Sequence, residues 1–170
     1  HTAKAEMVKQ LEERPYDSRY PLFLGSFLAS TGNVDEALIY LNKAHELSPR
    51  KQLVFFEIAS IYVRKGNYQE ALRYAKEAYD LAPTFPEAQK FYALLAIYTG
   101  NISLADEIIT DRKLYTDQRF INAFLSQGKA GRVVEVWKSV VAENPNNAQN
   151  HISLAAAYLA NGERSQAVKE

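Results

Sequence analysis

A chain of 170 residues is long enough for one domain with a sizeable hydrophobic core. Its 20 basic and 20 acidic side chains cancel, and a neutral chain lacks the basic surface that non-specific nucleic-acid binding requires. The absence of cysteine excludes disulfides and thiolate metal sites, and no apolar run approaches the roughly 18 residues of a membrane span. We therefore expect a segment that binds no nucleic acid and does not insert into a membrane.

From the N-terminus, the sequence predicts a lone helix within 1–17, which ends near Pro15, and then a series of helix pairs. In SRYPLFLGSFLASTG (18–32) and QLVFFEIASIYVRKG (52–66), apolar residues recur at helical spacing and a glycine ends the helix. A second helix is predicted directly after each glycine. The predicted single array consists of full pairs at 18–51, 52–85, 86–113 and 114–147 and a truncated pair at 148–170. Because both ends fall inside a pair, we expect the segment to be cut from a longer array.

The glycines between the two helices of a pair recur at a regular spacing. Gly32, Gly66 and Gly100 lie 34 residues apart, Gly128 follows after 28, and Gly162 comes 34 later. A period of this length is typical of helical repeat arrays. Mostly small residues, which allow close helix packing, stand seven before and five after each glycine: Gly25, Ala37, Ala59, Ala71, Ala93, Ala105, Ile121, Val133, Ala155 and Ala167.

The residues around each glycine are predicted to form a turn between helices, not a catalytic loop. Glycine after a periodic helix is the ordinary stop signal, because it adopts a backbone conformation that other residues resist. Asn33 with Glu36, and Asn67 with Glu70, have the spacing of a capping box at the start of the second helix.

The third pair departs from this pattern after YTGNISLADEIIT (98–110). Where further helix is expected, the chain reads DRKLYTDQ (111–118), and Arg112 stands where a small core residue is expected. We predict a second helix of about two turns and then a polar connection that tolerates changes in length. A functional notch is the alternative interpretation.

The order of small residue, glycine, alanine and proline resembles the tetratricopeptide repeat. Pro49, Pro83 and Pro145 each fall 17 residues after a glycine, and aromatic residues stand four before three of the glycines: Tyr62, Phe124 and Tyr158. The resemblance covers nearly the whole chain. It implies an all-α fold, a right-handed superhelical solenoid of antiparallel helix pairs, and a protein or peptide as partner.

The sequence contains no arrangement that points to catalysis, a metal or a cofactor. His1 is terminal, and neither His45 nor His151 has a second ligand at metal-binding spacing. The chain also lacks a Walker loop, a GxGxxG motif and a Ser-His-Asp order. We predict that the protein is not an enzyme and uses neither a metal nor a cofactor.

One stripe of the first helix in each pair is the candidate binding face. At 100° per residue, positions 13, 10, 6 and 3 before each glycine lie on one side of the first helix, away from the face that meets the second helix of the pair. We call these positions the first-helix stripe. In a stacked array, this stripe lines the concave groove. The predicted peptide-binding residues on or beside it are Arg19, Leu22, Ser26, Phe56, Ser60, Val63, Arg64, Lys90, Leu94, Ile97, Tyr98, Gln118, Asn122 and Leu125. The stripe also includes Leu53, Tyr115, Gln149, Ile152, Ala156 and Leu159.

Within the groove, Phe56, Leu94, Ile97 and Tyr98 are predicted to form a partly exposed apolar floor, because such a patch ringed by polar groups commonly marks an interaction surface. The predicted polar anchors are Arg64, Lys90, Gln118 and Asn122. The alternative is that neighbouring helices bury the apolar residues against each other. One groove known in the family grips a terminal carboxylate with lysine, asparagine and arginine, and that pattern is not found here.

Two functions fit these features. The first is a protein-protein interaction scaffold that binds a peptide or partner segment in the groove. The alternative is a non-catalytic, structural or self-associating appendage of a larger protein, since bacterial envelope and polysaccharide-assembly proteins carry arrays that look similar. End-to-end self-association is expected through Ala3, Met7 and Leu11 of the first helix. The locations considered are the cytoplasm and the soluble part of a membrane or envelope protein.

Overall fold

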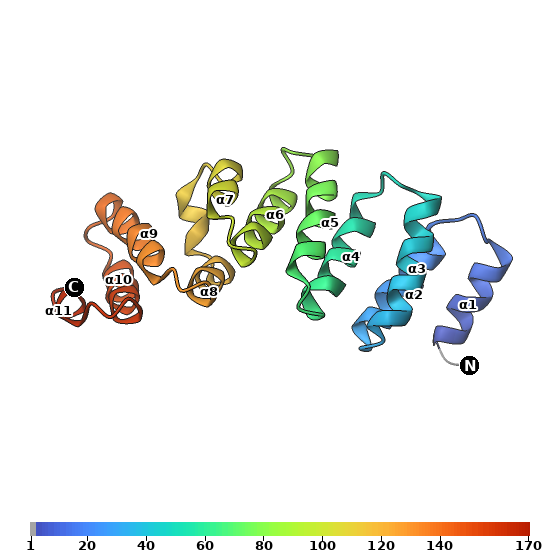
Figure 1. The fold of residues 1–170 in the computed structure, drawn as a ribbon, viewed down its shortest axis with the longest axis horizontal. Coiled ribbons are helices and arrows are strands. Elements are labelled where there is room, and N and C mark those ends of the chain that lie inside the picture. The colour runs from blue at the N-terminus through green and yellow to red at the C-terminus, as the bar shows by residue number, and fades with distance from the viewer. Residues whose placement is uncertain (1–2) are drawn as a thin grey trace. The chain divides into compact units, whose positions relative to one another are not determined.

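The computed structural model describes residues 3–170, and every regular element in that range is helical. The chain forms two compact units, one up to Tyr92 and the other Ala93–Glu170. In the first unit, α1 (Ala3–Glu13) precedes two helix pairs (Figure 1), which are α2 (Arg19–Ser30) with α3 (Val34–Leu47) and α4 (Gln52–Arg64) with α5 (Tyr68–Leu81). The prediction of an all-α chain is confirmed for these residues.

The second unit has shorter and less regular elements. Helix α6 (Pro86–Tyr98) begins in the first unit and ends in the second. It is followed by α7 (Ile102–Ile108), the 3-10 helix η1 (Arg112–Thr116), α8 (Gln118–Ser126), α9 (Ala130–Glu143), α10 (Ala148–Ala160) and α11 (Arg164–Ala167). The segments 18–51, 52–85 and 114–147 each contain two complete helices, whereas α7 and α11 are shorter second helices in 86–113 and 148–170.

Five glycines end the first helices in the way that the sequence predicts. Gly32, Gly66, Gly100, Gly128 and Gly162 all have a positive φ, between +66° and +86°. At the first of them, the Gly32 N–H donates to Ala29 O at 3.1 Å and the Asn33 N–H donates to Leu28 O at 2.9 Å. This pair of bonds is the Schellman motif, which satisfies carbonyl groups left over at a helix end. The repeated sequence is therefore a repeated helix stop.

One predicted capping box forms only in part and the other does not form. At the first, the Glu70 carboxylate pairs with Arg73 and the Asn67 N–H donates to Tyr62 O at 2.9 Å, so the return bond from Glu70 is not made. Asn67 accepts a hydrogen bond from the Glu70 N–H at 3.2 Å, as a capping residue does. Asn33 makes no such bond, because its Nδ2 donates instead to Thr31 Oγ1 at 3.1 Å. The Glu36 carboxylate accepts from Lys4 Nζ of α1 at 2.8 Å, so it helps to join α1 to α3.

The core of the first unit depends on small residues at helix contacts. A Cβ at Gly25 of α2 would lie 2.6 Å from Leu41 Cγ and 3.2 Å from Ala37 O, both in α3. Leu11 of α1 is buried and Met7 is half-buried against this core. Leu11 is therefore not free at this end of the first unit, whereas Ala3 is exposed, and end-to-end self-association stays a prediction.

In the second unit, η1 replaces the missing part of the second helix. Helix α7 has seven residues, which confirms the predicted short helix. The connection after it is not merely polar, however, because Tyr115 is 0% exposed and lies edge-on to Phe120 and Phe124 at 5.2 and 5.3 Å. The placement of Tyr115 in the groove is wrong for this reason, and its burial leads us to expect that the connection tolerates length changes less well than the sequence indicates.

Polar contacts hold this segment to α7 and α9. The Tyr115 hydroxyl donates to Asp106 Oδ1 at 3.0 Å, and Arg132 Nη2 donates to both Asp106 oxygens at 2.8 Å. Arg112 also pairs with Asp106, so this side chain, which stands where a small core residue is expected, lies at the surface and binds the carboxylate. Burial and the Asp106 charge raise the pKa of Tyr115, which keeps the hydroxyl protonated as a donor.

Candidate interaction surface

In the first unit, internal contacts occupy much of the first-helix stripe. Leu22 is fully buried, and Ser26, Ser60 and Val63 are half-buried. Phe56 of α4 is half-buried and lies edge-on to Phe91 of α6, with ring centroids 5.7 Å apart. Only the rims of these side chains are therefore available to a ligand, and the prediction that Leu22 lines the groove is wrong.

The three basic residues of the first unit that are predicted to line the groove also make contacts within the protein. Arg19 Nη2 donates to Asp17 Oδ2 at 2.6 Å, and this side-chain bond is the main reason that the pKa of Asp17 is lowered to about 2. Arg64 Nη1 donates to the Ala29 carbonyl of α2, and Lys90 pairs with Glu87 at 3.4 Å. Arg64 therefore links two first helices, as well as facing outward as the predicted anchor.

The predicted apolar floor is only partly present in the second unit. Leu94 and Tyr98 are half-buried, but Ile97 is 0% exposed and belongs to the core. The prediction that Ile97 is exposed in the groove is wrong, because helical periodicity gives its direction on α6 and not the presence of covering side chains. Tyr98 contributes its backbone carbonyl, which accepts from Gln127 Nε2 at 3.2 Å.

Exposed apolar residues of the stripe lie on α4, α8 and α10. On α4, Leu53 is 49% exposed. Leu125 is 39% exposed, Ile152 60% and Leu159 58%. Beside them, Gln118 Nε2 donates to Asn122 Oδ1 at 2.7 Å, and both amide side chains are exposed. That bond occupies neither the Gln118 oxygen nor the Asn122 nitrogen, so the pair offers one acceptor and one donor. This part of the stripe combines apolar contact with uncharged hydrogen-bonding groups.

Two hollows open beside these residues. One, of about 240 Å³, lies among α8, α9 and α10 and is lined by Gln118, Ile121, Leu125, Val133, Trp137, Ser153, Ala156, Ala157 and Ala160. The other, of about 680 Å³, lies along α10 and is lined by Pro145, Asn146, Ala148, His151, Ile152, Ala155, Ala156, Leu159 and Glu170. Ala156 lines both hollows, so they adjoin on the surface of α10.

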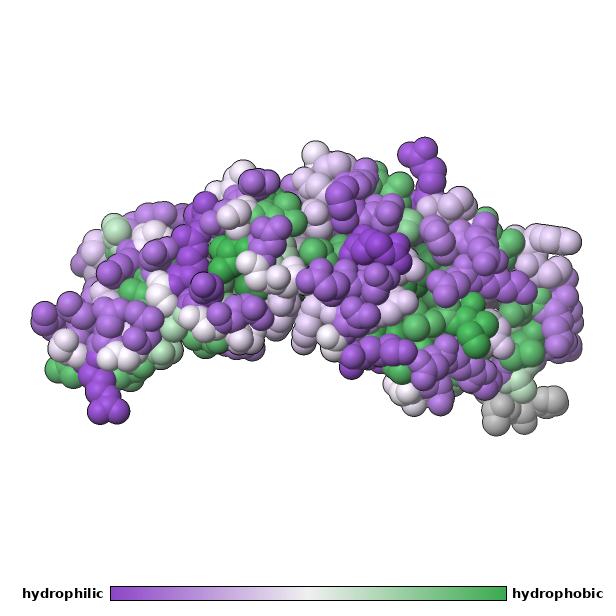
Figure 2. All heavy atoms as spheres, in the orientation of Figure 1, coloured by the Kyte–Doolittle hydropathy of each residue, from purple (hydrophilic) through white to green (hydrophobic). Residues whose placement is uncertain are grey.

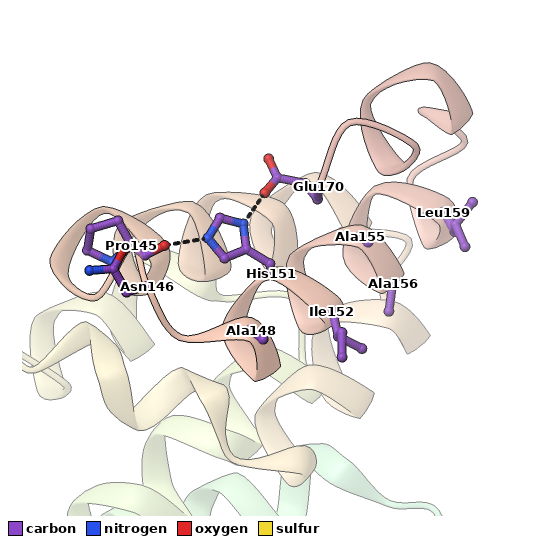
Figure 3. A pocket seen from close by; sticks show the side chains of 9 residues that line it. All are labelled: Pro145, Asn146, Ala148, His151, Ile152, Ala155, Ala156, Leu159 and Glu170. Atoms are coloured by element: carbon purple, nitrogen blue, oxygen red, sulfur yellow. Dashed lines mark hydrogen bonds and ion pairs between the residues drawn. The ribbon is translucent and has the colours of Figure 1, made fainter.

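The larger hollow includes the packing face of α10. Figure 3 shows the His151 ring between Pro145 and Glu170, with Ile152 and Leu159 projecting away from it. His151 Nε2 bonds to Pro145 O at 2.9 Å and Nδ1 to Glu170 Oε2 at 2.6 Å, and these two bonds, in that order, raise the pKa of His151. Ala155 has the register of Gly25, which contacts the second helix of its pair. We therefore assign this side of α10 to helix packing rather than to ligand binding.

Apolar exposure also occurs at positions that the sequence analysis did not select. Phe23 of α2 is 56% exposed and Ile39 of α3 is 67% exposed. Apolar surface is visible over the α1–α3 part of the first unit in Figure 2, where polar residues surround it. Neither residue lies on the first-helix stripe, so a search restricted to that stripe could not find them. Isolated exposed apolar residues are common and need no function.

Two further observations describe residues 3–170. These residues contain no group of three or more His, Asp or Glu side chains placed to bind a metal ion. No helix within the described range combines the length and apolar character required to cross a bilayer.

The helix pairs and the glycines that end their first helices define a helical-repeat fold. Comparison with known proteins then supports the resemblance: residues 19–84 match the tetratricopeptide repeat family, and solved structures of such proteins share the α-solenoid fold over nearly the whole chain. No curated protein sequence matches the chain.

Solved structures with this fold cover nearly all of the chain. YrrB, described as a TPR protein with an unusual peptide-binding site, gives a TM-score of 0.66 at 18% identity, over 98% of this chain and 89% of its own. A tetratricopeptide repeat protein from Parabacteroides merdae ATCC 43184 gives 0.72 at 19% identity, over 98% and 69%. MamA from Desulfovibrio magneticus RS-1 gives 0.63 at 14% identity, over 89% of each chain. At these identities the likeness shows the fold alone.

Proposed function

We propose that this chain is a non-catalytic interaction scaffold that binds a peptide or partner segment along the first-helix stripe. The observation that supports it most is the exposure of Leu125, Ile152 and Leu159 beside uncharged amides on α8. Apolar anchors surrounded by hydrogen-bonding groups are the usual composition of a peptide groove. The peptide-binding site named for YrrB is consistent with this proposal.

The stripe of the second unit carries most of the affinity in this proposal. In the first unit, the ion pairs and the backbone bond described above hold Arg19, Arg64 and Lys90 in place, so these residues direct the ligand rather than anchor it. Exposed ion pairs of this kind contribute little binding energy. Phe56, Ser60 and Val63 are half-buried residues of the same unit, and they are the apolar and small side chains that the ligand would meet there.

Selection from a random peptide library tests this proposal. Peptides of 12 residues are selected on the unaltered protein and then measured against Ile152→Ser/Leu159→Ser, with Ile39→Ser as the matched control. Ile39 is at least as exposed as the two test residues but lies on α3, outside the stripe. We expect the double variant to lose at least tenfold in affinity, because each apolar anchor contributes more than about 1 kcal/mol.

The proposal would be contradicted if the double variant bound the peptides as tightly as the unaltered protein, or if Ile39→Ser lost as much affinity as the double variant. Circular dichroism of each variant separates loss of binding from loss of folding. A library that yields no binder would favour the alternative, a structural or self-associating appendage of a larger protein, which sedimentation at rising concentration would then test.

A further inference from the structure

The hollow among α8, α9 and α10 exists because α10 carries small side chains at positions where α6 carries large ones. Counted back from their glycines, positions 9, 6, 5 and 2 of α6 are Phe91, Leu94, Leu95 and Tyr98. The same positions of α10 are Ser153, Ala156, Ala157 and Ala160, and all four line the hollow. The difference in side-chain volume leaves space that packing fills elsewhere.

Within the first unit, an aromatic pair fills the equivalent space. Phe56, ten positions before its glycine on α4, lies edge-on to Phe91, nine before its glycine on α6, at 5.7 Å. The corresponding residues of α8 and α10 are Gln118 and Ser153, which stand at the hollow. The chain therefore contains both a filled and an unfilled version of one site.

We propose that the hollow binds the side chain of a phenylalanine in the partner peptide, which takes the place that Phe91 takes in the first unit. The volume of about 240 Å³ suits one aromatic side chain and is smaller than the roughly 300 to 1,000 Å³ of sites for whole small ligands. Trp137, Ile121 and Val133 supply an apolar lining, and the Trp137 ring offers a surface for aromatic packing.

The lining also sets the chemistry of the bound segment. None of the nine lining residues is charged, and their polar side-chain groups are the amide of Gln118, the hydroxyl of Ser153 and the indole N–H of Trp137. A carboxylate or ammonium entering this hollow would lose its hydration without gaining an ion-pair partner. The site therefore selects a phenylalanine over an acidic or basic side chain. This inference rests on the proposed function for the peptide, while the side-chain site itself can be tested alone.

Trp137 gives a direct measurement, because it is the only tryptophan of the chain and it lines the hollow. The probe is N-acetyl-phenylalaninamide, with the α-amide of N-acetyl-aspartic acid, which keeps its side-chain carboxylate, as the charged comparison, and the readout is Trp137 emission during titration. We expect saturable binding of the phenylalanine probe and a Kd at least ten times higher for the charged one. Absence of a saturable change, or equal Kd values for the two probes, would overturn the inference.

Ser153→Phe places an aromatic ring of the chain itself in the hollow, at the register of Phe91. We expect it to raise the Kd of the phenylalanine probe at least tenfold, while Ser103→Phe, an exposed change on α7 away from the hollow, alters it less than twofold. Where circular dichroism shows that Ser153→Phe does not fold, Ala156→Leu fills the same space and must give the same loss. Probe binding that persists in the folded filled variant contradicts the inference.

The two proposals can fail separately. One outcome is that selected peptides depend on Ile152 and Leu159 but bind Ser153→Phe normally. That result would support the groove proposal and contradict the aromatic site. Probe binding that Ser153→Phe abolishes, without any peptide that depends on Ile152 or Leu159, would keep the aromatic site and remove the groove.

Discussion

The Asp106 carboxylate is predicted to be the main polar support of the second unit. It accepts the Tyr115 hydroxyl at 3.0 Å and two bonds from Arg132 at 2.8 Å, and it also pairs with Arg112. The side chains of Asp106 and Arg132 are each 25% exposed, so water screens their ion pair only in part. Replacing Asp106 by alanine leaves the buried Tyr115 hydroxyl without this acceptor.

The expected cost of Asp106→Ala follows from these contacts. An unpartnered buried hydroxyl costs about 1 to 3 kcal/mol. The Arg132 guanidinium keeps Glu135 as a partner at 2.7 Å. Loss of the Asp106–Arg132 ion pair therefore adds only about 1 kcal/mol to the cost. We therefore expect the free energy of unfolding to fall by about 2 to 4 kcal/mol. Tyr115→Phe removes one hydroxyl and leaves Asp106 with its arginines, so it should cost about 1 kcal/mol.

Urea unfolding measures these costs, with Trp137 fluorescence as the signal from the second unit and far-ultraviolet circular dichroism as the signal from all helices. Asp106→Asn is the matched control, because it keeps an acceptor for Tyr115 and should lose less than Asp106→Ala. A loss below about 0.5 kcal/mol for Asp106→Ala, the ordinary range of surface changes, would refute this account. Equal losses for Asp106→Ala and Tyr115→Phe would also refute it, since they would mean that the arginine pairs contribute nothing.

Three further predictions concern close packing, chain length and pH. Gly25→Ala should lower the free energy of unfolding by about 1 to 3 kcal/mol in urea, because the new Cβ would lie 2.6 Å from Leu41 Cγ. Two glycines inserted after Asp111 should cost more than the roughly 0.6 kcal/mol of loop lengthening, because they displace the buried Tyr115, and a cost equal to loop lengthening would contradict its role. His151 should titrate above 6.5 by NMR, and Glu170→Gln should lower that pKa while the Pro145 bond keeps it raised. Because the folded-state pKa is the higher one, this contribution to stability is complete below pH 6.5 and is lost as pH rises through the folded-state value; an unshifted titration would contradict it.

The helix pairs could be predicted from the sequence because their signals are local. A helix often ends at a residue with positive φ, and glycine adopts that conformation without help from the rest of the fold. Five such glycines mark the ends of the five first helices. The small residue at Gly25 is also informative, because the close approach of Leu41 admits no Cβ. Both signals repeat with the period of the array, which allowed them to be separated from chance.

The groove was harder to predict, because exposure depends on side chains from other helices. Leu22 and Ile97 have the periodicity of the stripe but are buried, whereas Ile152 and Leu159 have the same periodicity and are exposed. Arg64 was predicted as an anchor from its position alone, yet its guanidinium also binds the Ala29 carbonyl 35 residues away in sequence. Position on a helix fixes the direction of a side chain, and the neighbouring helix determines what it meets.

The segment 111–118 shows the same limit in the opposite direction. Its charged residues indicated an ordinary loop, since connections are usually polar and variable. The core contribution comes from Tyr115 alone, whose burial requires Phe120 and Phe124 from α8 and an acceptor from α7. A shortened second helix leaves a gap in the core, and one aromatic residue in the following segment fills it.

A hollow gives a weaker sequence signal than a patch, because small residues produce it. Ala156 and Leu159 of AAAYLA in α10 lie on the stripe, but the small residues of this segment give no apolar signal such as that of Phe56 and Leu94. The signal appears only when equivalent positions of two repeats are compared, with Phe91 against Ser153 and Leu94 against Ala156. In an array whose repeats use one packing scheme, a repeat with too little side-chain volume at a shared position has room for another molecule, so comparison of volumes between repeats can locate binding sites that hydrophobicity does not.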